Sequence, residues 1–303
     1  MRVFVAGASG AIGAPLIAEL LQRGHSVAGM TTSEAGAHNL QRQGAESALV
    51  DAFDASAVDA ALRRFKPEAV IDELTSLPKE PSDMPKYAPG DRKLRIEGGA
   101  NLFRAAIANG VQRYLQQSSG FFLKPAHGAL ADESSPLDVN ASPSVAAASR
   151  TYTELETRLF GSASIEAVAL RYGFFYGPGT WYYPGAAAAS AVMQQQVPLI
   201  GKGQGVSSFV HIQDAAIATV LLLTAEPGVY NLVDDDPSPQ VVWLPAFAKF
   251  LGAPPPPHKT DEEATAAAGE DAVYYATRLS GASNAKAKRV LGWKPRPLEW
   301  LQA

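Results

Sequence analysis

A glycine-rich turn that directly follows a short apolar segment constrains this chain more than any other feature. The sequence begins MRVFVA, which is typical of a buried strand, and continues GASGAIG, with glycine at positions 7, 10 and 13. The amphipathic residues 13–23 follow and predict a helix that begins near Ala11. Glycines so spaced allow a tight turn, close approach of a phosphate to the backbone, and close packing of the helix on the strand. The turn therefore predicts a site for a dinucleotide.

Strand patterns alternate with helical patterns over residues 1–172. The expected strands cover residues 1–6, 25–30, 47–50, 69–74, 111–118 and 165–171. The expected helices between them cover residues 34–43, 54–65, 94–109 and 144–160. This alternation predicts an α/β fold, a Rossmann-like doubly wound parallel sheet that is covered by helices on both faces. We expect residues 1–172 to form an NAD(P)-binding domain.

The character of the sequence changes after Gly173. Glycine and proline become dense, as in the runs YGPG, GKGQG and PPPP, and such segments favour loops and short elements. An apolar helix is expected at residues 214–225, and a strand near 229–233 is expected to return to the sheet. We therefore expect residues 173–303 to form a smaller C-terminal substrate-binding lobe that is assembled from separated segments.

Composition excludes several classes of protein. The chain has no cysteine, so disulfides, iron–sulfur clusters and cysteine zinc sites are excluded, and its five histidines have no metal-ligand spacing. The net charge of −4 comes without a basic stripe, which argues against a nucleic-acid partner. No apolar run approaches the roughly 20 residues of a membrane helix, and no signal peptide precedes the first strand. A cytoplasmic protein with no membrane partner is expected.

Six segments in a fixed order resemble the short-chain dehydrogenase/reductase superfamily in its extended, epimerase/dehydratase-like form. The glycine turn has the superfamily's GxxGxxG spacing. The other segments are GGANL at 98–102, QSS at 117–119, LRYGFFYGPG at 170–179, FVHIQD at 209–214 and AKAKRVLGWKP at 285–295. The resemblance implies a nicotinamide cofactor. In that family two long helices, here about 94–109 and 145–160, pack against a partner's copies, so a homodimer is among the expectations.

The resemblance also implies which residues line the cofactor. Asp51 stands where the family has an aspartate near the adenine, and residues 74–76 stand where its fourth strand borders the cofactor. The expected cofactor residues come from the glycine turn, the ends of the second to fifth strands and the segment after the sixth. They are Gly7, Ser9, Gly10, Ala11, Ile12, Gly13, Thr31, Thr32, Ser33, Asp51, Ala52, Leu74, Thr75, Ser76, Ser118, Tyr172, Gly173 and Phe174.

The end of the second strand distinguishes NADP from NAD. An acidic side chain there binds the ribose hydroxyls of NAD and repels the 2′-phosphate of NADP. Thr31 occupies that position, and Thr32 and Ser33 add two more hydroxyls that could donate to a phosphate. No arginine is adjacent and Glu34 is close, so these hydroxyls could also serve only as a helix cap. NADP is the preferred cofactor and NAD the alternative.

The residues expected to carry the chemistry are Ser119, Tyr152 and Tyr176. The family uses a tyrosine as acid/base, a lysine four residues later whose charge lowers the phenol pKa, and a serine or threonine that holds the substrate oxygen. Ser119 fits the last role, and Tyr176 lies in the loop expected to border the nicotinamide.

The tyrosine–lysine dyad itself is absent. In one register Tyr152 is the family tyrosine and Glu156 replaces the lysine; in the other, Tyr152 replaces the lysine and Ala148 the tyrosine. We prefer the second register, because Glu156 then matches an acidic residue that often follows the family lysine. In both registers the usual proton relay is broken.

The substrate is not expected to be a nucleotide sugar. Family members that act on such sugars resemble one another in an arginine just before the FVH segment, and this arginine grips the diphosphate. Ser207 stands at that place, and Glu270 and Asp271 lie where a second arginine would be. Aromatic residues follow two of the motifs and suit a smaller, less charged ligand or pack within the lobe. They are Phe121, Phe122, Trp181, Tyr182 and Tyr183.

Three functions are therefore compared. The leading hypothesis is an NAD(P)-dependent oxidoreductase that acts on a carbonyl or hydroxyl group of a small molecule. The broken dyad favours, as an alternative, a redox-sensing regulator that binds NADP without turnover. The third hypothesis is an epimerase or lyase that uses its cofactor transiently.

Overall fold

A seven-stranded parallel sheet forms the centre of the molecule. In the computed structural model, which describes residues 1–126 and 128–302, the strand order is β11-β6-β5-β4-β1-β2-β3. The strands are β1 (Arg2–Ala6), β2 (Ser26–Thr31), β3 (Glu46–Leu49), β4 (Ala69–Asp72), β5 (Arg113–Ser119), β6 (Glu166–Tyr172) and β11 (Gly228–Leu232). The order of connection reverses between β1 and β4, which is the switch point where open α/β sheets bind ligands. The predicted fold class is confirmed.

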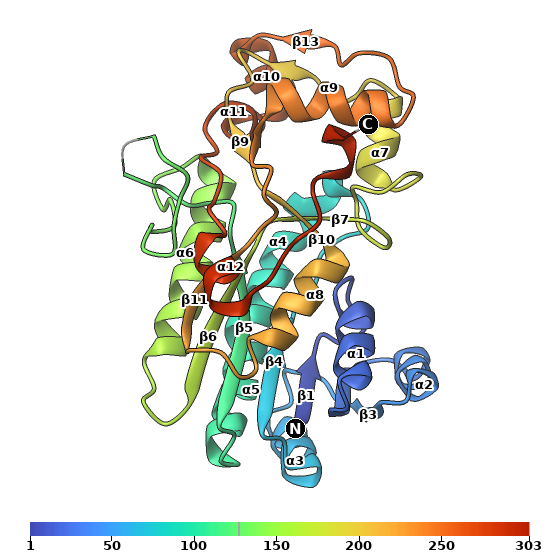
Figure 1. The fold of residues 1–303 in the computed structure, drawn as a ribbon, viewed down its shortest axis with the longest axis vertical. Helices are drawn as coiled ribbons and strands as arrows, with labels where there is room; N and C mark the ends of the chain where they lie inside the picture. The colour runs from blue at the N-terminus through green and yellow to red at the C-terminus, as the bar shows by residue number, and fades with distance from the viewer. Residues whose placement is uncertain (127, 303) are drawn as a thin grey trace.

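Helices cover both faces of this sheet (Figure 1). On one face lie α1 (Gly13–Gln22), α2 (Glu34–Gln43) and α8 (Ile212–Leu221), and on the other lie α3 (Ala55–Phe65), α5 (Gly99–Ala108) and α6 (Pro143–Phe160). Alternation along each strand supplies both cores: in β1, Val3 and Val5 face the first group of helices and Phe4 faces the second.

The helix predicted for residues 94–109 begins earlier than expected. It starts as α4 (Met84–Lys93), widens into a π-helical turn (Leu94–Gly98) and ends as α5. Pro89 and Gly90 in α4 disfavour a helix locally, which is why sequence reasoning placed the start too late. The helix predicted to begin near Ala11 begins at Gly13, because Ile12 is its N-cap.

The lobe lies above the carboxyl ends of the strands (Figure 1). Its helices are α7 (Ala187–Met193), α9 (Gln240–Phe250), α10 (Asp261–Ala268) and α11 (Glu270–Thr277). Three short strand pairs join them, namely β7 (Phe174–Tyr176) with β10 (Phe209–His211), β9 (Val206–Ser207) with β12 (Ser238–Pro239), and β8 (Leu199–Ile200) with β13 (His258–Lys259). Aromatic side chains such as Phe209, Trp243 and Phe247 form the core of the lobe.

The C-terminal half of the chain contributes more to the sheet side than one returning strand. Residues of α8 and α12 (Ala285–Leu291) pack in the same core as α1. Most of the lobe comes from residues 173–211 and 234–284. A single boundary between 172 and 173 therefore does not separate the two parts, because the chain returns to the sheet side between these ranges and after them.

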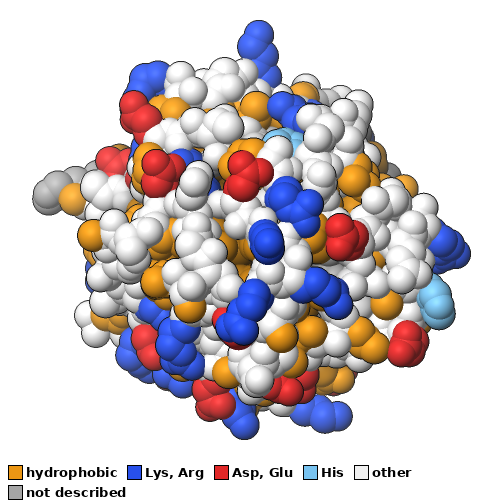
Figure 2. All heavy atoms as spheres, turned by 90° about the horizontal axis from the view of Figure 1, so that it is seen from below, with side chains coloured by type: hydrophobic (Ala, Val, Ile, Leu, Met, Phe, Trp, Pro, Cys, Tyr) orange, Lys and Arg blue, Asp and Glu red, His pale blue; other side chains and the backbone are white. Residues whose placement is uncertain are grey.

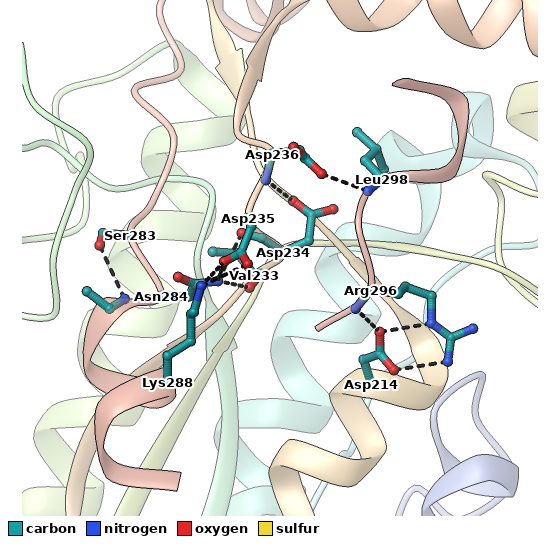
Figure 3. A network of polar contacts seen from close by, with 11 residues as sticks. Asp214, Val233, Asp234, Asp235, Asp236, Ser283, Asn284, Lys288, Arg296 and Leu298 are labelled. Atoms are coloured by element: carbon teal, nitrogen blue, oxygen red, sulfur yellow. Dashed lines mark hydrogen bonds and ion pairs between the residues drawn. The ribbon is translucent and has the colours of Figure 1, made fainter. Parts of the chain in front are cut away.

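The last residues tie the two parts together (Figure 3). Trp293 is buried in the core that contains α8, and Trp300 is buried in the lobe. Between them, Arg296 Nε forms an ion pair with Asp214 Oδ2 at 2.9 Å, and the Leu298 amide donates to Asp236 Oδ2 at 2.8 Å. The segment 293–300 therefore works as a strap between sheet and lobe, and it holds the carboxyl ends of the strands under the lobe.

The surface carries no single-sign patch on the face that Figure 2 shows, where basic and acidic side chains are interspersed around the amino ends of the strands. Within residues 1–126 and 128–302, no helix is both long and apolar enough to cross a membrane. The same residues contain no cluster of three or more histidine or acidic groups that could hold a metal ion.

Candidate cofactor and substrate site

The glycine turn is shaped by contacts that only glycine permits. Gly7 has φ +76°, and a Cβ there would collide with the Glu73 carbonyl oxygen at the end of β4. A Cβ at Gly13 would collide with the Ala8 carbonyl oxygen. Around Gly10 the nearest atom to such a Cβ is the Gly7 oxygen at 3.1 Å, and no other lies within 4 Å in the described part of the chain. The turn is therefore packed against the end of β4 at Gly7, whereas Gly10 leaves space beside the backbone.

The N-terminus of α1 has no protein cap within the described residues. Its N-cap residue Ile12 makes no side-chain hydrogen bond, and its first turn carries no acidic residue. Within the turn, the Gly10 amide donates to Gly7 at 2.9 Å and the Gly13 amide to Gly10 at 3.0 Å. Ser9, Gly10 and Ala11 are exposed. An uncapped helix start behind an open glycine turn fits the pyrophosphate of a dinucleotide.

The hydroxyl residues after β2 are divided between two roles. Ser33 Oγ accepts from the Gly36 amide at 3.1 Å and caps α2, as the helix-cap alternative supposed. Thr31 is buried, its hydroxyl accepting from the Ser33 amide at 3.4 Å, while Thr32 is exposed. Each of these bonds uses a lone pair and leaves the hydroxyl proton free. A hydroxyl can therefore cap α2 and still donate to a phosphate.

The loop after β3 is held by α5. Asn101 Nδ2 donates to the Ala52 carbonyl at 2.9 Å, and a Cβ at Gly98 would lie 2.9 Å from the Ala52 Cβ. Asp51 Oδ1 accepts from the Phe53 amide at 2.9 Å and is exposed. The GGANL segment thus fixes the backbone beside which the adenine is expected.

The loop after β4 is joined to the π-helical turn. Leu74 is buried, Thr75 is half-buried and Ser76 is exposed. The Ser76 amide donates to Asp91 Oδ1 at 2.6 Å, and the other Asp91 oxygen accepts from Arg95 Nε at 2.7 Å. One carboxylate therefore links the expected cofactor loop to a buried arginine.

Glu73 is a buried carboxyl that sequence reasoning missed. Tyr172 Oη lies 2.8 Å from Glu73 Oε1 and also bonds Thr219 Oγ1, which itself donates to the Ala215 carbonyl. Tyr172 is the donor in the bond to Glu73, and both groups are buried. Burial raises the pKa of Glu73 to about 8, which agrees with a neutral carboxyl at pH 7.

The two serines of β5 differ in their environment. Ser118 donates to Glu156 Oε1 at 2.6 Å, and Glu156 forms an ion pair with Arg171 at 2.7 Å. Ser119 has no exposed surface, and its oxygen accepts a long 3.5 Å bond from the Phe121 amide. The hydroxyl proton of Ser119 is thus uncommitted at the carboxyl end of the sheet. The Glu156–Arg171 pair joins α6 to the LRY segment.

Tyr152 has an arginine, not a lysine, as its cationic neighbour. The Arg95 guanidinium carbon lies 5.2 Å from the centre of the Tyr152 ring. Burial raises the pKa of the Tyr152 phenol, and Arg95 offsets part of that rise. The Tyr152 hydroxyl makes no hydrogen bond within the described ranges and is not among their fully buried unpartnered atoms. It is therefore open to a ligand.

Aromatic side chains from three parts of the chain gather beside Tyr152. Phe121, after β5, stacks on Phe174 of β7 with ring centres 4.3 Å apart, and both pack in one cluster with Tyr152. Tyr275 of α11 lies 6.2 Å from Phe174, and Tyr182 lies 6.3 Å from it. Burial raises the pKa of Tyr275, and the nearby phenols of Tyr182 and Tyr152 add to the rise. These five residues are called the aromatic cluster below.

A hydrogen bond between two helices sets the position of Tyr275. Asp271 Oδ1, in the first turn of α11, accepts from the Ser144 amide at the start of α6 at 3.2 Å. This anchors α11 on α6, so that Tyr275 lies over the helix that carries Tyr152. Sequence reasoning did not select Tyr275, although the YY pair in an otherwise small-residue helix was a visible signal. Trp181, which it did select, is half-buried, and Tyr183 is largely exposed.

Tyr176 does not join this cluster. Its side chain is buried in the lobe core, 5.1 Å from the ring of Trp300, and its hydroxyl donates to the Pro297 carbonyl at 3.2 Å. This buried position, with the hydroxyl bonded to the backbone, does not support the expected catalytic role of Tyr176. The sequence could not show it, because no local pattern indicates that the C-terminal strap covers this tyrosine. Gly173 and Phe174, in contrast, lie at the carboxyl end of β6 as expected.

Comparisons with known proteins agree with this geometry. The model of the NAD dependent epimerase/dehydratase family matches residues 3–232. A 3-diazoavenalumate denitrifying reductase from a Streptomyces species is 39% identical over 99% of this chain and 98% of its own. The chain belongs to the NAD dependent epimerase/dehydratase family. The match runs from the first strand of the sheet to the end of β11 and includes the glycine turn.

Solved structures of this family share the fold. The UDP-glucose 4-epimerase of Thermus thermophilus, in complex with NAD, superposes with a TM-score of 0.73 at 24% identity, covering 98% of this chain and 94% of that one. A double mutant of dTDP-glucose 4,6-dehydratase from Streptomyces venezuelae, with NAD bound, gives a TM-score of 0.76 at 18% identity, covering 98% and 92%. At these identities the likeness shows the fold alone.

In this chain the charged neighbours of Tyr152 are Arg95 and Asp91. Arg95, Glu73 and Tyr275 are the residues of the site that sequence reasoning missed. No local sequence pattern marks these three residues as part of a site. Each lies in a helix or loop whose position relative to the sheet the sequence does not show.

Proposed function

We propose that this protein is an NAD(P)H-dependent reductase of a small aromatic molecule that is not a nucleotide sugar. The observation that carries the proposal is the Tyr152 phenol, whose cationic neighbour is an arginine over its ring and whose hydroxyl makes no hydrogen bond in the described part of the chain. Such a phenol is a poor proton relay, because burial raises its pKa and Arg95 offsets only part of the rise. A reduction that needs no proton from the enzyme suits this site better than reduction of a carbonyl.

The aromatic cluster supports a planar substrate. Phe121, Phe174 and Tyr275 offer ring faces and edges, and Tyr152 and Tyr182 offer hydroxyls. Aromatic pairs prefer stacked or edge-to-face contact, so a planar ring fits among them. Ser207, at the place of the family's diphosphate-gripping arginine, is buried in β9 and cannot bind a diphosphate through charge.

A diazo group is the substrate group that the site and the relative together favour. The relative that is 39% identical bears a name that describes removal of nitrogen from a diazo compound by reduction. In such a step a C–H bond forms with the hydride's electron pair, the C–N bond breaks, and dinitrogen leaves with the pair from that bond. No proton is taken up. The reduced nicotinamide, when bound, supplies the hydride and is the group oxidised.

The residues of this chain then have defined tasks. The glycine turn and the uncapped α1 would hold the pyrophosphate, and Thr31 with its neighbours would hold the ribose end of NADP. The aromatic cluster would orient the substrate ring and exclude water, which competes as a nucleophile for a diazonium carbon. Ser119 would donate its free proton to an oxygen of the substrate without transferring it.

The decisive experiment follows hydride into product. Purified protein is mixed with NADPH that carries deuterium at one face of C4 and with 4-carboxybenzenediazonium, and the benzoate formed is measured by mass spectrometry. We expect deuterium at the former diazo carbon when the label is on one face of the nicotinamide C4 and none when it is on the other face. One NADPH should be consumed for each dinitrogen released. Heat-inactivated protein is the control, because diazonium ions also react with NADPH in solution without facial preference.

Other outcomes would replace the proposal. Turnover confined to a panel of aromatic aldehydes and ketones would establish a carbonyl reductase, as the sequence-based hypothesis supposed. Tight NADPH binding with no turnover of either panel would establish a non-catalytic binder. Tightly held cofactor with conversion of UDP-glucose and no net oxidation of NADPH would establish an epimerase.

A further inference from the structure

Arg95 is a buried arginine at the edge of the candidate site. Only 5% of its side chain is exposed, and it lies in the π-helical turn between α4 and α5. The wider turn displaces the chain outward from the regular helix and carries Arg95 between the loop after β4 and helix α6. Such turns recur at functional sites, but the contacts of Arg95 decide what it does here.

Two of the three guanidinium nitrogens of Arg95 are fixed by the protein. Nε donates to Asp91 at 2.7 Å, and Nη1 donates to Gln117 Oε1 on β5 at 3.1 Å. The guanidinium lies over the Tyr152 ring, which fixes its plane. Nη2 has no hydrogen-bond partner in the described part of the chain and is not one of its fully buried unpartnered atoms. The group therefore keeps one edge open toward a ligand.

Two further buried arginines, Arg113 on β5 and Arg171 on β6, have no guanidinium nitrogen without a hydrogen-bond partner. Arg113 donates from all three nitrogens to Glu166 and to the carbonyls of Leu222 and Ala225. Arg171 donates from Nε and Nη2 to Glu156, and its Nη1 donates to backbone carbonyls. Both hold the fold together.

The charges around Arg95 leave it attractive to an anion. The Asp91 carboxylate that pairs with Nε also accepts from the Ser76 amide at 2.6 Å, which draws part of its charge away from the guanidinium. Asp72 accepts from the Tyr114 hydroxyl and the Leu74 amide. Burial raises the pKa of Glu73 to about 8, so this carboxyl adds little negative charge at neutral pH.

We propose that Arg95 is the substrate's anion-binding residue, and that with the Tyr152 hydroxyl it receives a carboxylate of a small planar aromatic acid. Nη2 donates one charge-assisted hydrogen bond and the phenol donates a second, while the aromatic cluster holds the ring. This inference rests on the proposed function and names the substrate class as aromatic acids.

A binding experiment tests it without turnover. The protein loaded with NADP⁺ is titrated by calorimetry with cinnamate and with cinnamamide, which have the same ring and differ in charge. We expect cinnamate to bind at least tenfold more tightly to the wild type. In Arg95→Gln the preference should fall to near one, and in Arg95→Lys it should fall at least threefold, because an ammonium cannot hold Asp91 and Gln117 and still present a planar edge.

Arg92→Gln is the matched control. Arg92 lies one turn earlier, and its ion pair with Glu154 reaches the same helix α6, but both side chains are more than half exposed. This variant should keep the preference of the wild type. A wild type that binds both probes equally, or neither, overturns the inference, and so does a preference that Arg95→Gln or Arg95→Lys leaves unchanged. If reduction of diazo compounds fails but the preference is seen, the proposed function falls and the anion site stands.

Discussion

The guanidinium carbon of Arg95 lies 5.2 Å from the centre of the Tyr152 ring, so the cation of this site stands over the ring of the phenol. A cation at the oxygen would stabilise a phenolate, whereas a cation over the ring chiefly fixes the orientation of both groups. Burial still raises the pKa of Tyr152. The site is thus built to hold a neutral phenol in place.

Tyr152→Phe should therefore change kcat little. We expect a loss of less than about fivefold, whereas a general acid would contribute about 10²–10⁴-fold. KM should rise, because the phenol no longer donates to the substrate. Steady-state kinetics with the reducible substrate measures both, and Tyr183→Phe, at an exposed tyrosine of the lobe, is the control. A hundredfold drop in kcat would show that Tyr152 does transfer a proton.

Thr31→Asp should shift cofactor preference from NADP toward NAD. A carboxylate at the end of β2 repels the 2′-phosphate and can accept from the free ribose hydroxyls. We expect the Kd for NADPH to rise at least about tenfold, since a charge-assisted contact is replaced by repulsion, while the Kd for NADH stays equal or falls. Fluorescence titration measures both. Thr31→Asn has the same shape as the aspartate without the charge, and an equal effect of Asn would refute the electrostatic reason.

Gly7→Ala should abolish cofactor binding and destabilise the fold. Both its φ of +76° and the collision with the Glu73 carbonyl oppose a side chain. Gly24 has φ +78° with no described atom within 4 Å of a Cβ, so Gly24→Ala carries the strain without the collision. We expect about 1 kcal/mol of lost stability at Gly24 and a larger loss at Gly7. Urea unfolding and NADPH titration of both variants provide the comparison; equal losses would mean that the turn can yield.

Glu73→Gln should alter how stability depends on pH. The carboxyl titrates near 4.5 in an unfolded chain, and burial raises its pKa to about 8 in the fold. Between these values the folded state binds one more proton, so the free energy of unfolding falls as pH rises, by up to about 1.4 kcal/mol per pH unit. This contribution is complete below pH 4.5 and lost above about pH 8.

The glutamine keeps a carbonyl oxygen that can accept from Tyr172 and cannot ionise, so the variant should lack this slope. Asp234, whose pKa burial also raises to about 8, contributes in both proteins and cancels in the difference. Urea unfolding at intervals across the neutral range gives the difference between wild type and variant. Glu80→Gln, at an exposed residue, should follow the wild type. Parallel curves for wild type and Glu73→Gln would show that Glu73 is ionised in the folded protein.

Local features of the sequence were sufficient to predict the sheet and the glycine turn. The glycine spacing predicts the turn because only glycine tolerates the approach of Glu73 and Ala8. Period-two and period-3.6 patterns predict the elements because burial of apolar side chains depends on the face they occupy. The start of α4 was missed because Pro89 and Gly90 disfavour a helix in the local sequence.

The sequence by itself determined the parallel α/β sheet and the glycine turn, because each of these depends on a few neighbouring residues. Only the tertiary structure decided that Arg95 lies on Tyr152, that Tyr275 closes over the same helix and that Tyr176 is covered by the strap. The hydrogen bonds that fix the last two arrangements join residues 127 and 121 positions apart. Side chains so distant meet only once the layers pack, and local periodicity carries no information about which of them will face each other.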